Sequence, residues 1–353
     1  MARRSSRSAR PDVIPELRRH FEEFHKAHPA AATNIEEALS ELLSDAGVSY
    51  DRVSCRVKSW RSLRAKAVRQ ELAGEPRWSY PDPWHDIHDI IGARVTTFHS
   101  TAIPTVIDVL SDALEILETE DKTTQTRVSG EFGYGSHHLI ARIPTPAPPG
   151  LEGYEDSTLE VQIRTVLQHA WAEFEHDIRY KADPRKVDLD SVADARIDRA
   201  FTLAAGLIEL ADQQFDQIAA VLDERSPDTS ISTGADDVDI VAEDLPGMLT
   251  LMLGPRFPRS RADQYPWIKQ LLTANDVQTV GQLRELTTPE NVADVIDATG
   301  YSFTPGHARV VDDLLLQQFG DQHIAATAEL GRSAQRKNVL KSRLKQRLKS
   351  QRS

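Results

Sequence analysis

One stretch, Leu159 to Lys181 (LEVQIRTVLQHAWAEFEHDIRYK), constrains the fold of this chain more than any other segment. Apolar and polar residues alternate at its start, as in a strand with one buried face, and the polar set is Glu160, Gln162 and Arg164. Thr165 is a fair helix N-cap. Beyond it, apolar residues recur at helical spacing: Leu167, Trp171, Phe174 and Ile178. We predict a strand that points three polar side chains away from the core, with a buried helix behind it, although a solvated edge strand would show the same alternation.

Composition narrows the class of protein. The chain has 353 residues, of which 40% are hydrophobic, enough for two domains with at least one core. Its single cysteine, Cys55, excludes an intrachain disulfide and fits a reducing compartment, so we expect a cytoplasmic protein. No apolar run approaches the roughly 20 residues of a membrane span. The net charge of −12 argues against broad coating of nucleic acid.

The same reasoning predicts further strands near residues 51–57, 90–98 and 137–143, between helices at 13–26, 34–46, 103–117 and one that begins near Ser59. This alternation indicates an α+β fold, a mixed sheet flanked by helices. A long helix is expected from Ile197 to Leu222, where apolar residues recur at steps of four and three. Such a helix packs on its own domain or forms a contact between subunits of a homo-oligomer, and we expect the former.

The chain divides into segments by composition. Residues 1–11 are expected to be a disordered basic arm, 12–222 the mixed-sheet domain, 223–244 an acidic linker, 245–325 a smaller all-α domain and 326–353 a basic tail. No Asp or Glu follows Glu329, and Leu340, Leu344 and Leu348 recur at every fourth position among Lys and Arg. We expect the tail to fold back on the acidic linker or to bind an external polyanion such as RNA.

The turn between the strand at 51–57 and the following helix is unusually basic. Arg56, Lys58 and Lys66 flank a helix N-terminus, whose free N–H groups favour anions. This combination is suited to holding phosphates without a glycine-rich loop, although a solvated basic helix face would look the same. Further along, Tyr134, Ser136 and His138 alternate and so share one face of a strand, where an aromatic ring can stack on a base.

Five motifs follow one another in order. They are R-x-K-S-x-x-S-x-x-x-K, D-I-I-G-A-R, G-Y-x-S-x-H, E-V-Q-I-R-T and W-x-x-x-E-H-D-I-x-Y-K, beginning at Arg56, Asp89, Gly133, Glu160 and Trp171. In this order and spacing the chain resembles the alarmone synthetase domain of the RelA/SpoT family over about residues 30–225. The resemblance implies a nucleotidyltransferase-like fold and a small, single-catalytic-domain synthetase with a helical extension. The implied reaction is that of a GTP diphosphokinase of the stringent response, which transfers pyrophosphate from ATP to the 3′-OH of GDP or GTP to make (p)ppGpp.

The resemblance also implies a role for each motif residue. The ATP donor would be held by Arg56, Lys58, Ser62, Lys66 and Arg94, with the two arginines on opposite faces of the adenine. Asp89 and Glu160 would hold Mg²⁺, and Glu160 is the better candidate to accept the proton of the acceptor hydroxyl. The acceptor nucleotide would contact Tyr134, His138, Gln162 and Arg164, with its guanine stacked on the tyrosine.

Transfer of a pyrophosphate group requires cationic and carboxylate side chains of the kind found in these motifs. Phosphoryl transfer needs positioning and cations over developing charge, and Mg²⁺ binds through one or two carboxylates together with phosphates. The chain departs from the family's pattern at Gly135, where a basic residue is frequent, and at Phe132, both on the acceptor side. Two alternatives therefore stay open: a toxic relative that makes adenosine alarmones or pyrophosphorylates tRNA 3′ ends, and a catalytically dead nucleotide- or RNA-binding adaptor. Retention of both Asp89 and Glu160 argues against the second.

Overall fold

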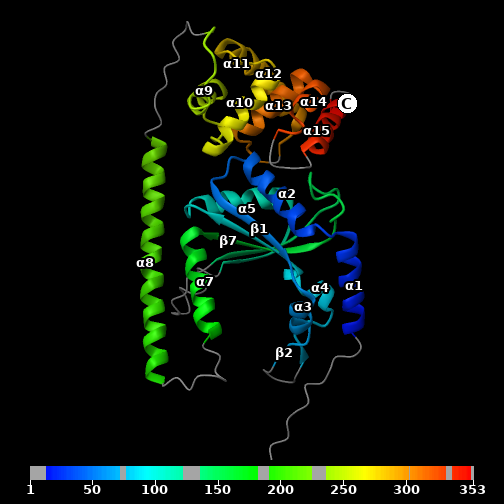
Figure 1. Cartoon of the computed structure of the whole chain (residues 1–353), viewed down its shortest axis with the longest axis vertical. Helices are drawn as coiled ribbons and strands as arrows, with labels where there is room; N and C mark the ends of the chain where they lie inside the picture. Colours follow the sequence, from blue (N-terminus) through cyan, green and yellow to red (C-terminus); the bar gives the residue numbers. More distant parts are fainter. Residues whose placement is uncertain are drawn as a thin grey trace, which may run out of the picture.

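A five-stranded mixed sheet forms the centre of the computed structural model (Figure 1). The structure describes residues 13–71, 77–121, 136–181, 191–224, 236–301, 303–330 and 336–350. The strand order is β1-β4-β7-β6-β5, in which β4 and β7 are parallel and the other neighbours antiparallel. The strands are β1 Tyr50–Val57, β4 Ile91–Thr97, β5 Glu115–Asp121, β6 His137–Arg142 and β7 Thr158–Thr165. The predicted fold class is thereby confirmed.

One face of the sheet is covered by α2 (Ala31–Asp45) and α5 (Ala102–Ala113) (Figure 1). The main core lies between these helices and the sheet. Its fully buried members include Ile35 and Leu39 of α2, Leu110 of α5 and Val161 and Ile163 of β7. Along β7, buried residues alternate strictly with half-buried ones, as the sequence predicts. The polar residues of β7 therefore lie on the opposite face of the sheet, where the helices leave room for a site.

The lower face carries α1 (Ile14–Ala27), α3 (Trp60–Ala67), the short α4 (Pro83–Asp86) and α7 (Val166–Lys181) (Figure 1). A two-stranded ribbon, β2 (Gln70–Glu71) with β3 (Arg77–Trp78), and a 3-10 turn, η1 (His88–Ile90), lie between α3 and β4. Part of this segment packs on α1 and α3, because Ile87 and Ile90 join Leu17 and Leu63 in a small apolar cluster.

The long helix α8, Ser191–Glu224, packs one side against α7. Trp171 of α7 meets Phe201 edge to face, and both side chains are buried. The other side of α8 exposes large apolar residues, including Leu203, Leu207 and Leu210. The expectation that α8 packs on its own domain is confirmed near Phe201, whereas Phe215 and Ile218 of the expected apolar stripe are exposed. A contact between subunits through this stripe stays the alternative. Phe174, expected on the buried stripe of α7, is 60% exposed.

The helix expected at 103–117 was predicted too long. It ends at Ala113, and β5 follows as an edge strand. Leu114 is buried as expected, but Leu117 is 39% exposed because it belongs to the strand and not to the helix. The helical spacing of Leu110, Leu114 and Leu117 continued by chance across the helix end.

The helical domain has a core of its own and lies beyond α2, above the sheet in Figure 1. Its helices are α9 Leu245–Leu253, α10 Tyr265–Ala274, α11 Val280–Leu286, α12 Pro289–Thr299, α13 His307–Phe319, α14 Asp321–Thr327 and α15 Arg336–Ser350, with a 3-10 turn η2 Ala262–Gln264. The local sequence defines their starts: Thr279 and Gln282 form a capping box for α11, and Thr288 caps α12 with Pro289 in its first turn. Buried residues surround α13 on nearly every side, so it is the central helix.

Two expected segment boundaries differ from the structure. The described end of the expected linker, residues 236–244, packs on the helical domain: Ile240 is buried, and Asp239 forms a β-bridge with Thr279. In the tail, α15 buries Arg336, Arg343 and Arg347 together with Leu340, whereas Leu348 is exposed. The acidic partners of these arginines lie on α2 and α13. No helix among the described ranges is long and apolar enough to cross a membrane.

Candidate active site

The basic turn after β1 forms as predicted. Ser59 caps α3, and its hydroxyl oxygen accepts a hydrogen bond from the N–H of Ser62 at 3.3 Å. Lys58 is fixed next to the cap because its own N–H donates to the carbonyl of Ile90 at 2.8 Å. Lys66 lies one turn beyond Ser62. Two amines and a hydroxyl therefore gather around the N-terminus of α3, which favours anions.

Asp89 lies between the two lysines. Its Oδ2 is 2.9 Å from Nζ of Lys58 and its Oδ1 is 3.0 Å from Nζ of Lys66. Burial opposes the charged form of this carboxyl, but hydrogen bonds from both lysines outweigh it and hold the pKa of Asp89 below its ordinary value. Asp89 is therefore ionised at neutral pH, as a metal ligand must be.

Glu160 is the second carboxylate of the site. Its Oε1 is 2.7 Å from Nδ1 of His138 and accepts a hydrogen bond from Nε2 of Gln162 at 3.1 Å. The hydrogen bond from His138 is the main cause that lowers the pKa of Glu160 to about 2; burial opposes the shift, and Gln162 and the charge of Lys66 support it. Lys66 contacts Asp89, and its charge also lowers the pKa of Glu160, so one lysine acts electrostatically on both carboxylates.

A hydrogen-bonded chain crosses β6 and β7. Ser136 Oγ is 2.7 Å from Nε2 of His138, which contacts Glu160, and Nη2 of Arg164 donates to Oε1 of Gln162 at 3.0 Å. The register pairs His138 with Gln162, so these side chains share the face opposite the core. The predicted common face of Glu160, Gln162 and Arg164 is thus confirmed, and Ser136 and His138 join it.

The two arginines expected around the adenine differ in their surroundings. Arg56 is exposed and pairs with Gly92 across β1 and β4, and a Cβ on Gly92 would lie 3.8 Å from Nε of Arg56. The side chain of Arg56 therefore passes over β4 at Gly92, at a distance where a Cβ would make an ordinary contact. Arg94 is directed toward α7, where its Nη1 donates to Oε1 of Glu173 at 3.1 Å and lies 3.3 Å from Nδ1 of His169.

His169 and Glu173 were missed by the sequence reasoning. They are four residues apart on α7 and so lie on one side of the helix, next to the polar face of β7. That spacing, directly after a strand with three polar residues, was the signal that could have identified them. Burial, followed by the charge of Arg94, lowers the pKa of His169, so its ring is neutral at pH 7. Tyr134, together with Phe132 and Gly135, lies outside the described residues.

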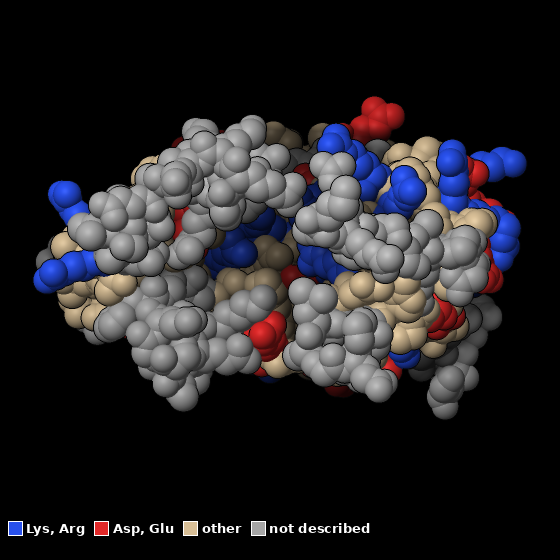
Figure 2. All heavy atoms as spheres, turned by 90° about the horizontal axis from the view of Figure 1, so that it is seen from below, with Lys and Arg blue, Asp and Glu red and all other residues tan. Residues whose placement is uncertain are grey.

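The surface agrees with this arrangement. Seen from below the sheet, Lys and Arg side chains gather inside a hollow at the centre of the molecule (Figure 2). The cations of such a hollow are suited to nucleotide phosphates, and ionised carboxylates such as Asp89 and Glu160 are the oxygen ligands that Mg²⁺ prefers. Among the described residues, no group of three or more His, Cys, Asp and Glu side chains could hold a metal. Mg²⁺ at Asp89 and Glu160 would therefore take further ligands from phosphates or water.

Comparison with known proteins agrees with the motif order. Residues 55–185 match the family described as "Region found in RelA / SpoT proteins". GTP pyrophosphokinase YjbM of Bacillus subtilis (strain 168) is 29% identical over 173 residues, 46% of this chain and 75% of that protein. GTP pyrophosphokinase YwaC of the same organism is 30% identical over 135 residues, 37% of this chain and 59% of that protein. The small alarmone synthetase 1 from Bacillus subtilis bound to its product pppGpp aligns with 58% of this chain and 99% of its own, at 22% identity and a TM-score of 0.43.

Proposed function

From the match of residues 55–185 to the family described as "Region found in RelA / SpoT proteins", we propose that the protein is a (p)ppGpp synthetase. It transfers pyrophosphate from ATP to the 3′-OH of GDP or GTP. The observation that supports this most directly is the pair of ionised carboxylates, Asp89 and Glu160, whose pKa values are both lowered and on both of which the charge of Lys66 acts. Both curated relatives described above are named GTP pyrophosphokinases. The single cysteine, Cys55, fits a reducing compartment, and we infer a cytoplasmic location.

On the donor side, Lys58, Ser62 and Lys66 bind the phosphates of ATP at the N-terminus of α3, and Arg56 and Arg94 enclose the adenine. Both lysines are paired with Asp89 in the nucleotide-free structure. Since each amine has three hydrogens to donate, it can contact a phosphate without leaving the carboxylate. The lysines also stabilise the charge that develops on the transferred group.

Asp89 and Glu160 would hold Mg²⁺. When bound, the ion neutralises phosphate charge and orients the donor for in-line attack. The pKa of about 2 makes Glu160 a weak base in the nucleotide-free state, so its first role is that of a ligand and of an acceptor for His138. His138, bonded on its other side to Ser136, holds the carboxylate in place.

On the acceptor side, Tyr134 stacks on the guanine, and His138, Gln162 and Arg164 line the cleft beside it. The connected contacts from Ser136 to Glu160 and from Arg164 through Gln162 to Glu160 support this grouping. The acceptor therefore meets the same face of β6 and β7 that carries the metal carboxylate.

The test is direct transfer of label from ATP. Purified protein is incubated with ATP labelled in its β- and γ-phosphates and with GDP, GTP, AMP, ATP or deacylated tRNA in separate reactions. We expect label on GDP or GTP, lost in Asp89→Asn and in Glu160→Gln because each removes a negative oxygen ligand of the metal. Glu152→Gln, at a carboxylate outside the site, is the matched control. Label on adenine nucleotides or tRNA alone would overturn the guanosine assignment, and full activity of either site variant would overturn the metal assignment.

A further inference from the structure

Helix α2 connects the two domains. One side of it packs on the sheet, and its C-terminal end reaches the helical domain (Figure 1). There the N–H of Gly306 donates to the carbonyl of Asp45 at 2.7 Å. A Cβ placed on Gly306 would lie 2.9 Å from the Cα of Gly47, so the two backbones touch and neither position has space for a side chain. Phe303 adds an apolar contact with the core of the mixed-sheet domain.

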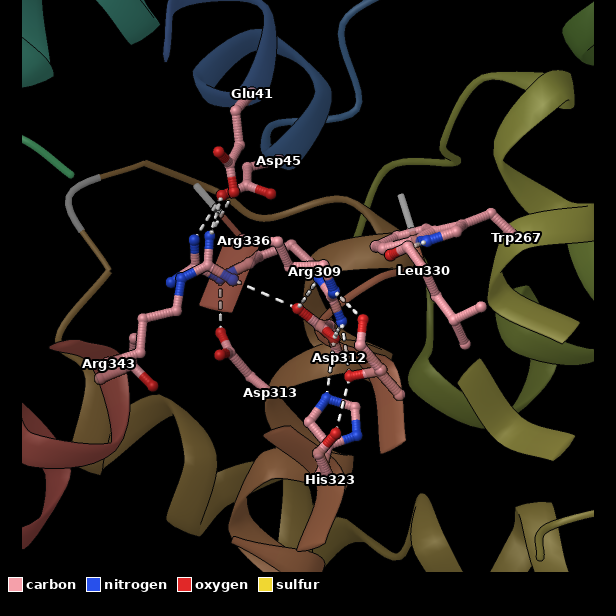
Figure 3. Close-up of polar contacts among 12 residues, drawn as sticks. Glu41, Asp45, Trp267, Arg309, Asp312, Asp313, His323, Leu330, Arg336 and Arg343 are labelled. Atoms are coloured by element: carbon pink, nitrogen blue, oxygen red, sulfur yellow. Dashed lines mark hydrogen bonds and ion pairs between the residues drawn. The ribbon is translucent and has the colours of Figure 1, made fainter. Parts of the chain in front are cut away.

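Asp45 is the ionic centre of this contact. Its carboxylate accepts hydrogen bonds from Arg309 of α13 and, at 2.8 Å, from Nη2 of Arg343 of α15 (Figure 3). Arg343 also contacts Asp312 at 3.3 Å and Glu41 at 3.5 Å, so one side chain joins α15 to α13 and α2. Asp45 is the last residue of α2, where the helix dipole disfavours a negative charge. The two arginines supply the compensation that the helix itself lacks.

Glu41, one turn before Asp45, gives α2 a second half-buried carboxyl at the same place. Burial and the charge of Asp45 raise the pKa of Glu41, and Arg343 and Arg309 oppose the shift. A cavity of about 530 Å³ lies beside these residues, between α2, the start of β1 and the helical domain. The contact between α2 and the helical domain is therefore held here by ion pairs and hydrogen bonds, not by continuous apolar packing.

The same helix holds β1 on its other side. The hydroxyl of Tyr50, the first residue of β1, lies 2.9 Å from Oγ of Ser44 and donates to the carbonyl of Ser40 at 3.2 Å. Further along the strand, Oε2 of Glu36 accepts the N–H of Cys55 at 2.9 Å. Because β1 is an edge strand, an outward N–H has no neighbouring strand to pair with, and a carboxylate of α2 takes that place. The helical domain also reaches the start of β1, where the guanidinium of Arg261 lies over the ring of Tyr50 at 4.5 Å.

β1 ends at Val57, directly after Arg56, and Lys58 and the cap of α3 follow at once. We propose that the helical domain positions the ATP-binding end of β1 through α2, with Asp45 and Glu36 as the positioning residues. Asp45 fixes α2 to the helical domain, and Glu36 fixes β1 to α2. The assignment of ATP to this end of the strand rests on the proposed function; the mechanical link between the helical domain and β1 does not.

Two variants of the full-length protein test the two links separately. Asp45→Asn removes the charge shared by Arg309 and Arg343, and Glu36→Ala removes the acceptor of the Cys55 N–H while leaving the domain contact intact. We expect both to accelerate amide hydrogen exchange in residues 50–58 by roughly tenfold or more, the effect of losing one charge-assisted hydrogen bond. Both should raise the KM for ATP several-fold and leave the KM for the guanine nucleotide nearly unchanged. Asp45→Glu, which keeps the charge, should bring amide exchange in residues 50–58 and the KM for ATP most of the way back to the wild-type values.

Glu37→Gln is the matched control, because it removes the same charge from α2 at a side chain that borders the cavity and is not an ion-pair partner of the arginines in the described structure. Unchanged exchange at 50–58 in Glu36→Ala and Asp45→Asn would overturn the proposal, as would an equal change in the control. Exchange needs no turnover. If the wild-type protein makes no product while exchange still responds, the proposed function fails and the coupling stands.

Discussion

Asp312 allows a quantitative test of the buried ion cluster in the helical domain. Its side chain is 2% exposed, and it accepts hydrogen bonds from His323, Arg336 and Arg343 (Figure 3). Burial alone would raise its pKa, but the charge of Arg336 and the hydrogen bond from His323 lower the pKa of Asp312 far below its ordinary value. The carboxylate is therefore ionised at neutral pH and compensates the charge of Arg336, which is itself buried.

We expect Asp312→Asn to lower the free energy of unfolding by roughly 3–5 kcal/mol, the cost of leaving a buried charge without its partner. The loss centres on Arg336, because Arg343 keeps its contacts with Asp45 and Glu41. With a slope of about 2 kcal/mol per molar urea, the unfolding midpoint should fall by about 1.5–2.5 M. This is a large share of the about 5–15 kcal/mol that stabilises a folded domain.

The assay is urea unfolding followed by circular dichroism, with amide exchange in α13 to show that the helical domain carries the loss. Asp294→Asn, at an exposed position of α12, is the control and should change stability by less than about 0.5 kcal/mol. Asp312 has a depressed folded pKa, so its contribution is present above the unfolded value of about 3.8 and is lost as pH falls through the lower folded value. The deficit of Asp312→Asn should therefore be the same at pH 7 and pH 5. A loss below about 1 kcal/mol would refute the inference that Arg336 is buried with this carboxylate as its main compensation.

Two further predictions concern charge. The folded pKa of Glu160 is about 2, against 4.5 ordinarily, so its ionised form contributes stability above about pH 4.5 that is lost as pH falls toward 2. In ¹³C spectra, the carboxyl signal of Glu160, identified by its absence in Glu160→Gln, should show no protonation between pH 7 and about 4. His138→Leu should bring the titration of Glu160 into that range, and identical titration with and without His138 would contradict the assigned cause. Replacing the exposed Lys337, Lys341 and Lys345 by Glu should abolish any salt-sensitive RNA binding, while urea stability stays close to wild type. In filter binding across a salt series, the slope of log affinity against log salt concentration should become shallower by about 0.7–0.9 for each phosphate contact that is lost. Unchanged binding would show that α15 is not the RNA contact.

The sequence was sufficient for four of the five strands of the sheet because short-range patterns determine them. Alternation in β7 predicted the shared face of Glu160, Gln162 and Arg164, and a helix was expected to begin near Ser59, where α3 starts. The same kind of evidence failed at β5. Its residues are exposed or half-buried along the whole strand, so no alternation separates it from the helix before it, and the spacing of the leucines continues across the boundary.

Contacts between distant segments could not be predicted in this way. Nothing near Arg94 in the sequence indicates that Glu173 and His169 will receive its guanidinium, because they lie on a helix more than seventy residues further along. The same holds for Asp45, whose partners come from α13 and α15. A charged residue is expected to be exposed unless it is paired, and its partner is defined only by the tertiary fold.

The buried arginines change how the basic tail can act. The tail was expected to fold back on the acidic linker or to bind an external polyanion, but α15 buries its arginines against α2 and α13 and exposes lysines on its outward side. Arg336 and Arg343 compensate Asp312 and Asp45, and Arg347 donates to the carbonyl of Asp313 at 2.7 Å. Removing the whole tail would leave Asp45 with Arg309 alone and Asp312 with His323 alone, and it would loosen the contact with α2. A loss of activity on truncation would therefore report the lost support of β1 as readily as a lost partner. Charge reversal at the outward lysines separates the two effects, because it changes what the helix offers to a polyanion and leaves the inward arginines in place.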